Sequence, residues 1–243
     1  MANWSDPRAR ATSFAAPGAT ARSDAYDAGL RSYMLSVYNY MASGVLLTGI
    51  VAMLFASSGM AAQVLATPLR WVIMLAPLAF VMVLSFGINR LSTAAAQGLY
   101  WAFAVVMGLS LSSIFLVFTG TSIATTFFAT AAAFAGLSLY GYTTKRDLSA
   151  FGTFLIMGVV GILIASLINL FVQSSGLQLV ISFIGVLLFA GLTAYDTQKI
   201  KGMYYQVQGS DFVGKSVVLG ALTLYLDFVN MFTFLLNFMG SRE

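Results

Sequence analysis

Long apolar runs, separated by short polar connections, make up most of the chain. A helix that crosses a bilayer needs about 20 predominantly apolar residues. Seven runs reach or approach this length: Leu35–Phe55, Trp71–Ile88, Tyr100–Phe118, Ile123–Tyr140, Ala150–Val172, Leu177–Ala194 and Val217–Met239. The pattern predicts an all-α membrane protein with seven transmembrane helices, which together form one transmembrane domain over residues 32–240.

The connections refine this prediction at two places. The third and fourth runs are joined only by Thr119-Gly120-Thr121-Ser122, which predicts a tight hairpin between two helices. The last run contains Asp227, and an acid weakens a membrane-spanning helix. A six-span arrangement with a re-entrant last segment is therefore the main alternative.

The first 31 residues differ from the rest, because they are rich in Ala, Ser, Thr, Arg and Asp and hold Trp4 and Phe14 as isolated aromatics. They contain no apolar run of 7–15 residues, so they do not form a signal peptide. We interpret residues 1–31 as a polar, mobile cytoplasmic tail. A docking function for this tail is the alternative to simple disorder.

Composition supports the membrane class and excludes several kinds of chemistry. Of the 243 residues, 59% are hydrophobic and 8% are charged, whereas soluble domains have about 25% charged residues. The chain has neither cysteine nor histidine. This excludes thiolate catalysis, the usual general base of hydrolases and a histidine pH switch, so any proton sensing must use carboxylates. The net charge of +4 does not indicate a nucleic-acid partner, because the basic residues lie in short loops.

The distribution of lysine and arginine predicts the orientation in the bilayer. If the N-terminus is cytoplasmic, only Arg70 and Arg242 lie on the outer side. The cytoplasmic segments then hold Arg8, Arg10, Arg22, Arg31, Arg90, Lys145, Arg146, Lys199, Lys201 and Lys215. Ten against two is a strong positive-inside bias, so we expect a cytoplasmic N-terminus and an outer C-terminus.

The last apolar run carries a stripe of small and polar residues on one helical face. Steps of three and four residues align Ser216, Gly220, Thr223, Asp227, Asn230, Phe234 and Asn237. Polar side chains facing lipid would lack hydrogen-bond partners, so the stripe should face protein or a water-filled cavity. For Thr223, Asn230 and Asn237, binding a neighbouring helix is the simpler function. For Asp227 it is less convincing, because a neutral amide would do the same at lower cost.

A second acid, Asp196, follows the preceding apolar run. An ionisable residue inside lipid costs about 2.5–3.5 kcal/mol even on permissive insertion scales, so each acid is a candidate functional residue. The two runs are antiparallel neighbours, and a tilt of either helix would bring Asp196 and Asp227 to one depth. The alternative for Asp196 is an interfacial acid that forms a salt bridge with Lys199 or another nearby lysine.

Four segments, in the same order, resemble the Bax inhibitor-1 family, whose bacterial branch includes modulators of a membrane-bound AAA protease. The most distinctive is Gly191-Leu192-Thr193-Ala194-Tyr195-Asp196-Thr197-Gln198-Lys199. The others are Tyr38-Asn39-Tyr40-Met41, Gly141-Tyr142-Thr143-Thr144-Lys145-Arg146-Asp147-Leu148-Ser149 and Ala221-Leu222-Thr223-Leu224-Tyr225-Leu226-Asp227-Phe228-Val229-Asn230. The resemblance covers about residues 24–240.

This resemblance implies a bacterial inner-membrane protein in which six helices surround a central C-terminal helix. It also implies a pH-sensitive calcium leak, controlled by a hydrogen-bonded aspartyl pair at the matching positions Asp196 and Asp227. Arg90 corresponds, by a weaker local match, to the arginine that family members keep near the pair. Histidine-based control is not expected here, because the chain has no histidine.

The chemistry of such a pair follows from its setting. Two carboxylates in a low-dielectric site resist being ionised together, so they are expected to share one proton. Loss of that proton leaves adjacent negative charges, which favour separation and hydration. Calcium prefers several oxygen ligands, and Thr223 and Asn230 are candidates to supplement Asp196 and Asp227 in a weak site. Calcium is thus expected as the transported ion, protons as the regulator, and no cofactor.

Two other functions compete with a leak channel. An intramembrane aspartyl protease also places acids on late helices, but it has Gly-x-Gly-Asp where this chain has Tyr225-Leu226-Asp227, so we expect no enzyme. The stronger alternative is a non-transporting modulator that binds a membrane protease or another membrane partner. Deletion of residues 1–24 distinguishes the two, because it should leave flux intact in a channel and abolish partner binding in a modulator.

Overall fold

The computed structural model describes residues 17–242, with side chains from Ala28 onward. Within this range every regular element is helical. In chain order the elements are α1 (Pro17–Ser57), α2 (Met60–Leu65), α3 (Leu69–Gly87), η1 (Ile88–Arg90), α4 (Thr93–Leu111), η2 (Ser112–Leu116), α5 (Gly120–Thr143), α6 (Ser149–Val172), α7 (Ser175–Val207) and α8 (Val213–Met239).

Seven of the described helical segments are long and apolar enough to cross a membrane, which confirms the predicted spans. The short helix α2 between the first two spans was not predicted. The hairpin between the third and fourth spans has the expected position, since η2 ends at Leu116 and α5 begins at Gly120. The hydroxyl of Thr119 accepts a hydrogen bond from the backbone N–H of Ser122 and so caps the start of α5.

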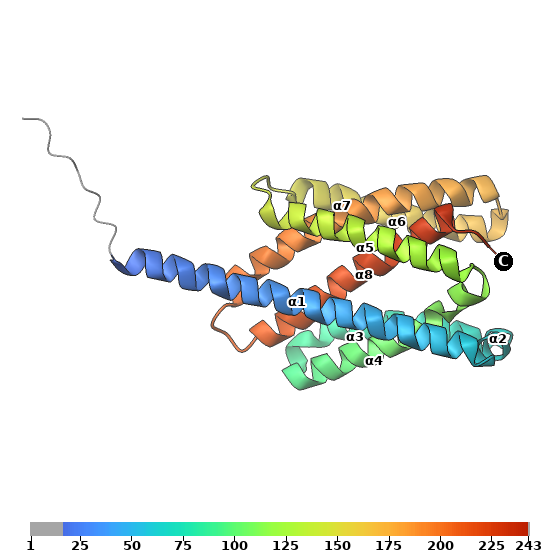
Figure 1. Ribbon diagram of the computed structural model, residues 1–243, viewed down its shortest axis with the longest axis horizontal. Helices are drawn as coiled ribbons and strands as arrows, with labels where there is room; N and C mark the ends of the chain where they lie inside the picture. Colours follow the sequence, from blue (N-terminus) through green and yellow to red (C-terminus); the bar gives the residue numbers. More distant parts are fainter. Residues whose placement is uncertain (1–16, 243) are drawn as a thin grey trace, which may run out of the picture.

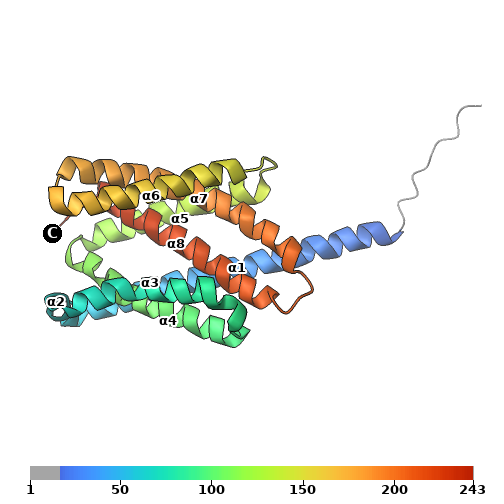
Figure 2. The same ribbon diagram turned by 180° about the vertical axis from the view of Figure 1, so that it is seen from behind.

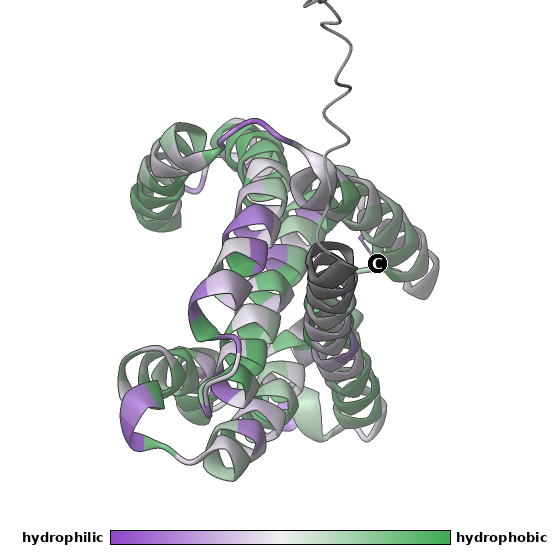
Figure 3. Cartoon of the chain, turned by 90° about the vertical axis from the view of Figure 1, so that its left-hand side faces the viewer, coloured by the Kyte–Doolittle hydropathy of each residue, from purple (hydrophilic) through white to green (hydrophobic). Residues whose placement is uncertain are grey.

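Helix α8 is the most enclosed of the spans. In the most apolar 18-residue segment of each helix, 67% of the residues of α8 are buried, compared with 44% for α7 and 11% for α6. In Figures 1 and 2 it crosses the molecule obliquely between a layer of α1, α3 and α4 and a layer of α5, α6 and α7. Figure 3 looks along the bundle and shows predominantly hydrophobic outer helices. This arrangement agrees with six helices around a central one.

The last helix is continuous, which contradicts the re-entrant alternative. Its 27 residues correspond to about 40 Å at 1.5 Å per residue, more than a hydrocarbon core of about 30 Å requires. Its end is also attached to the bundle. The backbone N–H of Thr119 donates to the Ser241 carbonyl at 3.1 Å, and the Ser241 N–H donates to the Ser122 hydroxyl at 2.9 Å.

Helix α1 extends into the segment that we predicted as a polar tail through residue 31. Helix α1 begins at Pro17, and its membrane-spanning part begins at Ala28. Residues 17–31 therefore belong to the first helix, which is consistent with the high helix propensity of the alanines in this segment. The remainder of the predicted tail, residues 1–16, lies outside the described residues.

A neutral polar network joins α8 to α1 and α4. The hydroxyls of Thr48 and Tyr225 are 2.6 Å apart, and Thr48 also donates to the Ala104 carbonyl at 2.8 Å. Because a threonine has one proton to donate, Tyr225 must be the donor to Thr48. The Tyr225 ring packs against Phe103 with centroids 5.0 Å apart. Every polar side-chain atom of this network thus has a partner.

Candidate functional site

The two predicted acids meet between α7 and α8. These helices are antiparallel and joined by residues 208–212. Asp196 lies 11 residues before the end of α7 at Val207, and Asp227 lies 14 residues after the start of α8 at Val213. At 1.5 Å per residue, the two acids are about 16 Å and 21 Å along their helices from this connection. They are therefore at similar depth.

Both carboxyl groups are buried and interact directly. Asp196 is 8% exposed and Asp227 is 4% exposed, and their side chains are close enough to form a hydrogen bond when one of them is protonated. Oxygen Oδ2 of Asp227 is fully enclosed and receives no hydrogen bond from an N–H or O–H group of the described residues. A buried polar atom without a donor is costly, so this site is less completely satisfied than the Tyr225 network on the opposite side of α8.

Lys199 is the cation that acts on the pair. It attracts both carboxyls, but its side chain is exposed and its Nζ lies 5.9 Å from the centre of the Tyr195 ring. The expected alternative for Asp196 was an interfacial acid paired with this lysine. The burial of Asp196 and its contact with Asp227 favour the acid pair over that interpretation.

Two glycines position the segment of α7 that carries Asp196. A Cβ atom at Gly141 would collide with the carbonyl oxygen of Ala194, so only glycine permits this approach of α5 to α7. A Cβ atom at Gly152 would collide with the Tyr195 ring, so α6 also leaves room for α7 here. Both contacts lie within two residues of Asp196, which fixes its backbone against two neighbouring helices.

The loop between α5 and α6 is bonded to α7 just beyond Asp196. The Gln198 amide accepts a hydrogen bond from the Leu148 N–H at 2.9 Å and donates to the Arg146 carbonyl at 2.8 Å. Nζ of Lys201 donates to the Tyr142 carbonyl at 2.8 Å and lies 4.9 Å from the centre of that ring. Two of the segments that carried the family resemblance are therefore in direct contact.

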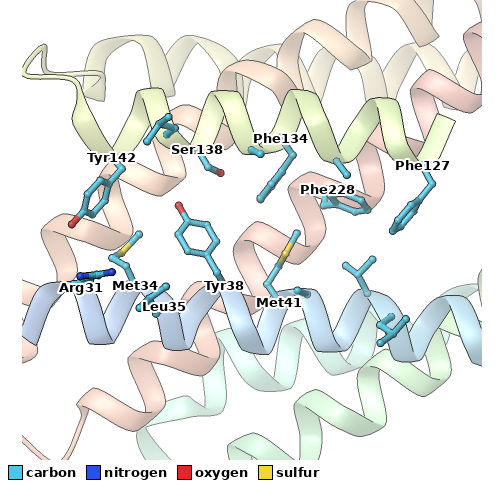
Figure 4. A pocket seen from close by; sticks show the side chains of 16 residues that line it. Arg31, Met34, Leu35, Tyr38, Met41, Phe127, Phe134, Ser138, Tyr142 and Phe228 are labelled. Carbon is cyan, nitrogen blue, oxygen red and sulfur yellow. The ribbon is translucent and has the colours of Figure 1, made fainter. Parts of the chain in front are cut away.

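A hydroxyl cluster connects this region to α1. Thr197 donates to the Ser138 hydroxyl at 3.4 Å, and the Tyr38 hydroxyl interacts with both. In Figure 4 the Tyr38 hydroxyl points toward Ser138 on α5. The cluster therefore links α1 and α5 to the residue of α7 that follows Asp196. None of the three was predicted as a site residue, although Tyr38 and Thr197 lie in segments that resemble the family, because their separation in the sequence hides their proximity.

The supporting residues Thr223 and Asn230 lie one helical turn on either side of Asp227. The Thr223 hydroxyl donates to the Leu219 carbonyl at 3.0 Å, and the Asn230 amide donates to the Leu226 carbonyl at 2.8 Å. Asn237 likewise donates within α8, to the Thr233 carbonyl. The side-chain donors of the three residues thus bond to their own helix, whereas we expected them to bind a neighbouring one.

Arg90 is the candidate that the structure does not bring to the pair. It ends η1, its side chain is exposed, and it is not among the charges that act on either carboxyl. No third acidic side chain of the described residues lies close enough to the pair to complete a metal site. Among residues 28–242, no three acidic, histidine or cysteine side chains gather closely enough to hold a metal ion.

Comparison with known proteins gives a consistent result. Residues 30–243 match the family model described as "Inhibitor of apoptosis-promoting Bax1". The chain is 48% identical to "Inner membrane protein YbhL" of Escherichia coli K12, over 89% of this chain and 94% of that protein. It is 47% identical to "Uncharacterized protein RP147" of Rickettsia prowazekii, over 92% and 95% respectively. With the seven apolar helices, these findings support a multi-pass inner-membrane protein.

Proposed function

The chain belongs to the Bax inhibitor-1 family, and from that premise we propose that it is a pH-sensitive calcium leak channel gated by Asp196 and Asp227. The observation that carries the proposal is the direct contact of two buried carboxyls between α7 and α8. Most buried acids in proteins are paired with a base, so a buried pair of acids requires a different explanation.

A shared proton provides that explanation for the closed state. Two ionised carboxylates in contact would repel one another at low dielectric, and their shared titration belongs to the pair. With one proton between them, the pair carries a single negative charge that Lys199 partly offsets. This proton also supplies a hydrogen bond at a site where Oδ2 of Asp227 otherwise has no donor.

Loss of the shared proton changes both the packing and the solvation of the site. Two adjacent negative charges favour separation of α7 from α8 and entry of water between them. The segment of α7 that carries Asp196 is held against α5 at Gly141 and against α6 at Gly152, and Asp227 faces it from α8. We therefore assign the movement to the α7–α8 contact.

A hydrated pair of carboxylates is suited to a divalent cation in transit. Calcium takes six to eight oxygen ligands, and Asp196 and Asp227 supply at most four carboxylate oxygens. Thr223 and Asn230, one turn on either side of Asp227, are placed to add oxygens, with water completing the shell. With two acids rather than three or more, binding is weak, as a conduction pathway requires.

We further propose that the N-terminus is cytoplasmic and the C-terminus is outside. Because the spans alternate in direction, the ends of α3, α5 and α7 lie at the same end of the bundle as the start of α1 (Figure 1). The basic side chains described at that end are Arg31, Arg90, Lys145, Arg146, Lys199, Lys201 and Lys215, against Arg70 and Arg242 at the other. This distribution supports a cytoplasmic location for that end.

Calcium flux in proteoliposomes, measured at a series of pH values, tests the channel proposal. We expect a clear pH dependence for the wild-type protein and a flattened profile for Asp227→Asn and for Asp196→Asn. Asp211→Asn is the matched control, since Asp211 is exposed in the α7–α8 connection and should leave the profile unchanged. Wild-type profiles in both pair variants would exclude the gating mechanism. Absence of flux from the wild-type protein would favour the modulator instead.

A further inference from the structure

An apolar groove separates α1 from α5 along the side of the bundle. It has a volume of about 660 Å³, and Figure 4 shows its lining. The small side chains of Ala42, Ala131 and Ala135 widen its walls, and Phe228 of α8 forms its floor. Its outer rim includes Leu35, Leu46 and Leu139, which are 50%, 64% and 64% exposed. In a membrane these rim residues face the acyl chains, so the groove opens to lipid.

The groove continues toward the other end of the bundle. A second cavity of about 420 Å³ shares Val45, Phe127 and Phe228 with the first and is lined by α1, α5, α8 and the α4–η2 segment. None of the residues that line this second cavity is charged. The two cavities together therefore form one elongated apolar groove parallel to the membrane-spanning helices.

Only the end near the start of α1 is basic. Arg31 lines the first cavity there, opposite Tyr142 of α5. Lys201 extends over the Tyr142 ring, with Nζ 4.9 Å from its centre, and brings a second cation to this end. The positive end of the groove matches the negatively charged headgroup of an anionic phospholipid, and its long apolar interior matches an acyl chain.

We propose that this groove binds one acyl chain of an anionic phospholipid from the leaflet on the basic side, with the headgroup phosphate at Arg31. An acyl chain suits the long interior of the groove, and the cationic end gives the site its preference for an anionic headgroup.

Lipid binding to the full-length protein in detergent, followed by native mass spectrometry, tests this proposal. The probes are phosphatidylglycerol and phosphatidylcholine with identical acyl chains. One surface cation contributes about 1 kcal/mol toward an anionic lipid, so Arg31→Gln should reduce the preference for phosphatidylglycerol about fivefold. Arg90→Gln, which removes an exposed arginine at the same end of the bundle, should leave the preference unchanged.

A second pair of variants tests the acyl-chain part of the site. Ala135→Phe places a large side chain in the groove and should weaken binding of both lipids. Ala133→Phe adds the same bulk at an exposed position of α5 outside the groove and should not. Equal binding of the two lipids to the wild-type protein, or equal effects of the two phenylalanines, would overturn the proposal.

The location of the bound lipid is measured without any variant. Phosphatidylglycerol with a photoreactive group on one acyl chain should label peptides of α1 and α5 in the wild-type protein. Labelling spread evenly over the outward faces of α3 and α6 would indicate bulk lipid contact and contradict a defined site. This measurement decides the question even if Ala135→Phe fails to fold.

Discussion

Helix α8 makes two buried polar contacts on opposite sides, and they differ in kind. Tyr225 and Asp227 are two residues apart, so their side chains point in roughly opposite directions. Tyr225 belongs to a neutral network with Thr48 and the Ala104 carbonyl in which every side-chain atom has a partner. Asp227 contacts another acid, and one of its oxygens has no donor among the described residues.

Under the proposed function, the first contact holds the helices together and the second is the one expected to respond to protons. A satisfied neutral network has the same hydrogen bonds at any physiological pH, because neither tyrosine nor threonine ionises there. A pair of acids has different hydrogen bonds at each protonation state. We therefore expect one side of α8 to be a fixed attachment and the other side to be a contact that pH alters.

The largest expected effect is loss of the fixed attachment. Tyr225→Ala removes a fully buried aromatic ring and leaves Thr48 without its donor, so it should destabilise the protein by about 3–5 kcal/mol. Thermal unfolding in detergent measures this loss, which should be similar at acidic and neutral pH. Tyr140→Ala, at a tyrosine that is 49% exposed, is the control. A loss that depends strongly on pH would contradict the assignment of Tyr225 to a neutral contact.

Separation of α5 from α7 should have the next largest effect. Gly141→Leu forces α5 away from the Ala194 carbonyl and should cost about 1–3 kcal/mol, as overpacking does elsewhere. Gly136→Leu is a matched control on the same helix, since no atom lies within 4 Å of a Cβ placed there. Because Ala194 is two residues from Asp196, the pH profile of calcium flux should also shift in the first variant alone. An unaltered profile would show that α5 does not position the acid.

Two conservative substitutions compare the two sides of α8 directly. Tyr225→Phe removes one hydrogen bond, so it should cost about 1 kcal/mol at every pH. Asp227→Asn keeps the shape of the side chain but removes its ionisation, so it should change how thermal stability varies with pH. Unfolding temperatures of both variants across a pH series measure these outcomes. If both variants kept the wild-type pH dependence, the two sides of α8 would not differ as described.

The smallest effect is expected at Thr223. Its hydroxyl donates to a carbonyl of its own helix, so Thr223→Val should change stability by less than about 0.5 kcal/mol. If the hydroxyl oxygen contributes to the ion pathway, the same variant should reduce calcium flux while leaving the pH midpoint unchanged. A shift of the midpoint would instead place Thr223 in the proton-sensing contact.

Hydrophobic runs predicted the seven spans, but not their ends. Helix α7 continues to Val207, although the apolar run stops at Ala194, because polar residues such as Gln198, Lys199 and Lys201 are good helix formers. Helix α1 likewise begins at Pro17, before the first apolar run. An alanine-rich polar segment extends a helix as readily as an apolar one.

The candidate acids were predictable because ionisable residues are rare within apolar runs. Their direct contact was not predictable, since the relative rotation of α7 and α8 depends on packing throughout the bundle. Thr48, Tyr225 and Gln198 were not predicted to make contacts between helices for a similar reason, although Tyr225 and Gln198 lie in segments that resemble the family. Threonine, tyrosine and glutamine are common in such sequences, and only the tertiary structure shows which of them bind across helices.

The central position of the last span has a consequence for biosynthesis. Helix α8 leaves the ribosome after the other six spans and is the most enclosed of them. Until it arrives, the partners it will cover, including Thr48 on α1 and Asp196 on α7, face a gap within the nascent bundle. Chains truncated before Val213 should therefore remain incompletely assembled and be removed by membrane proteases.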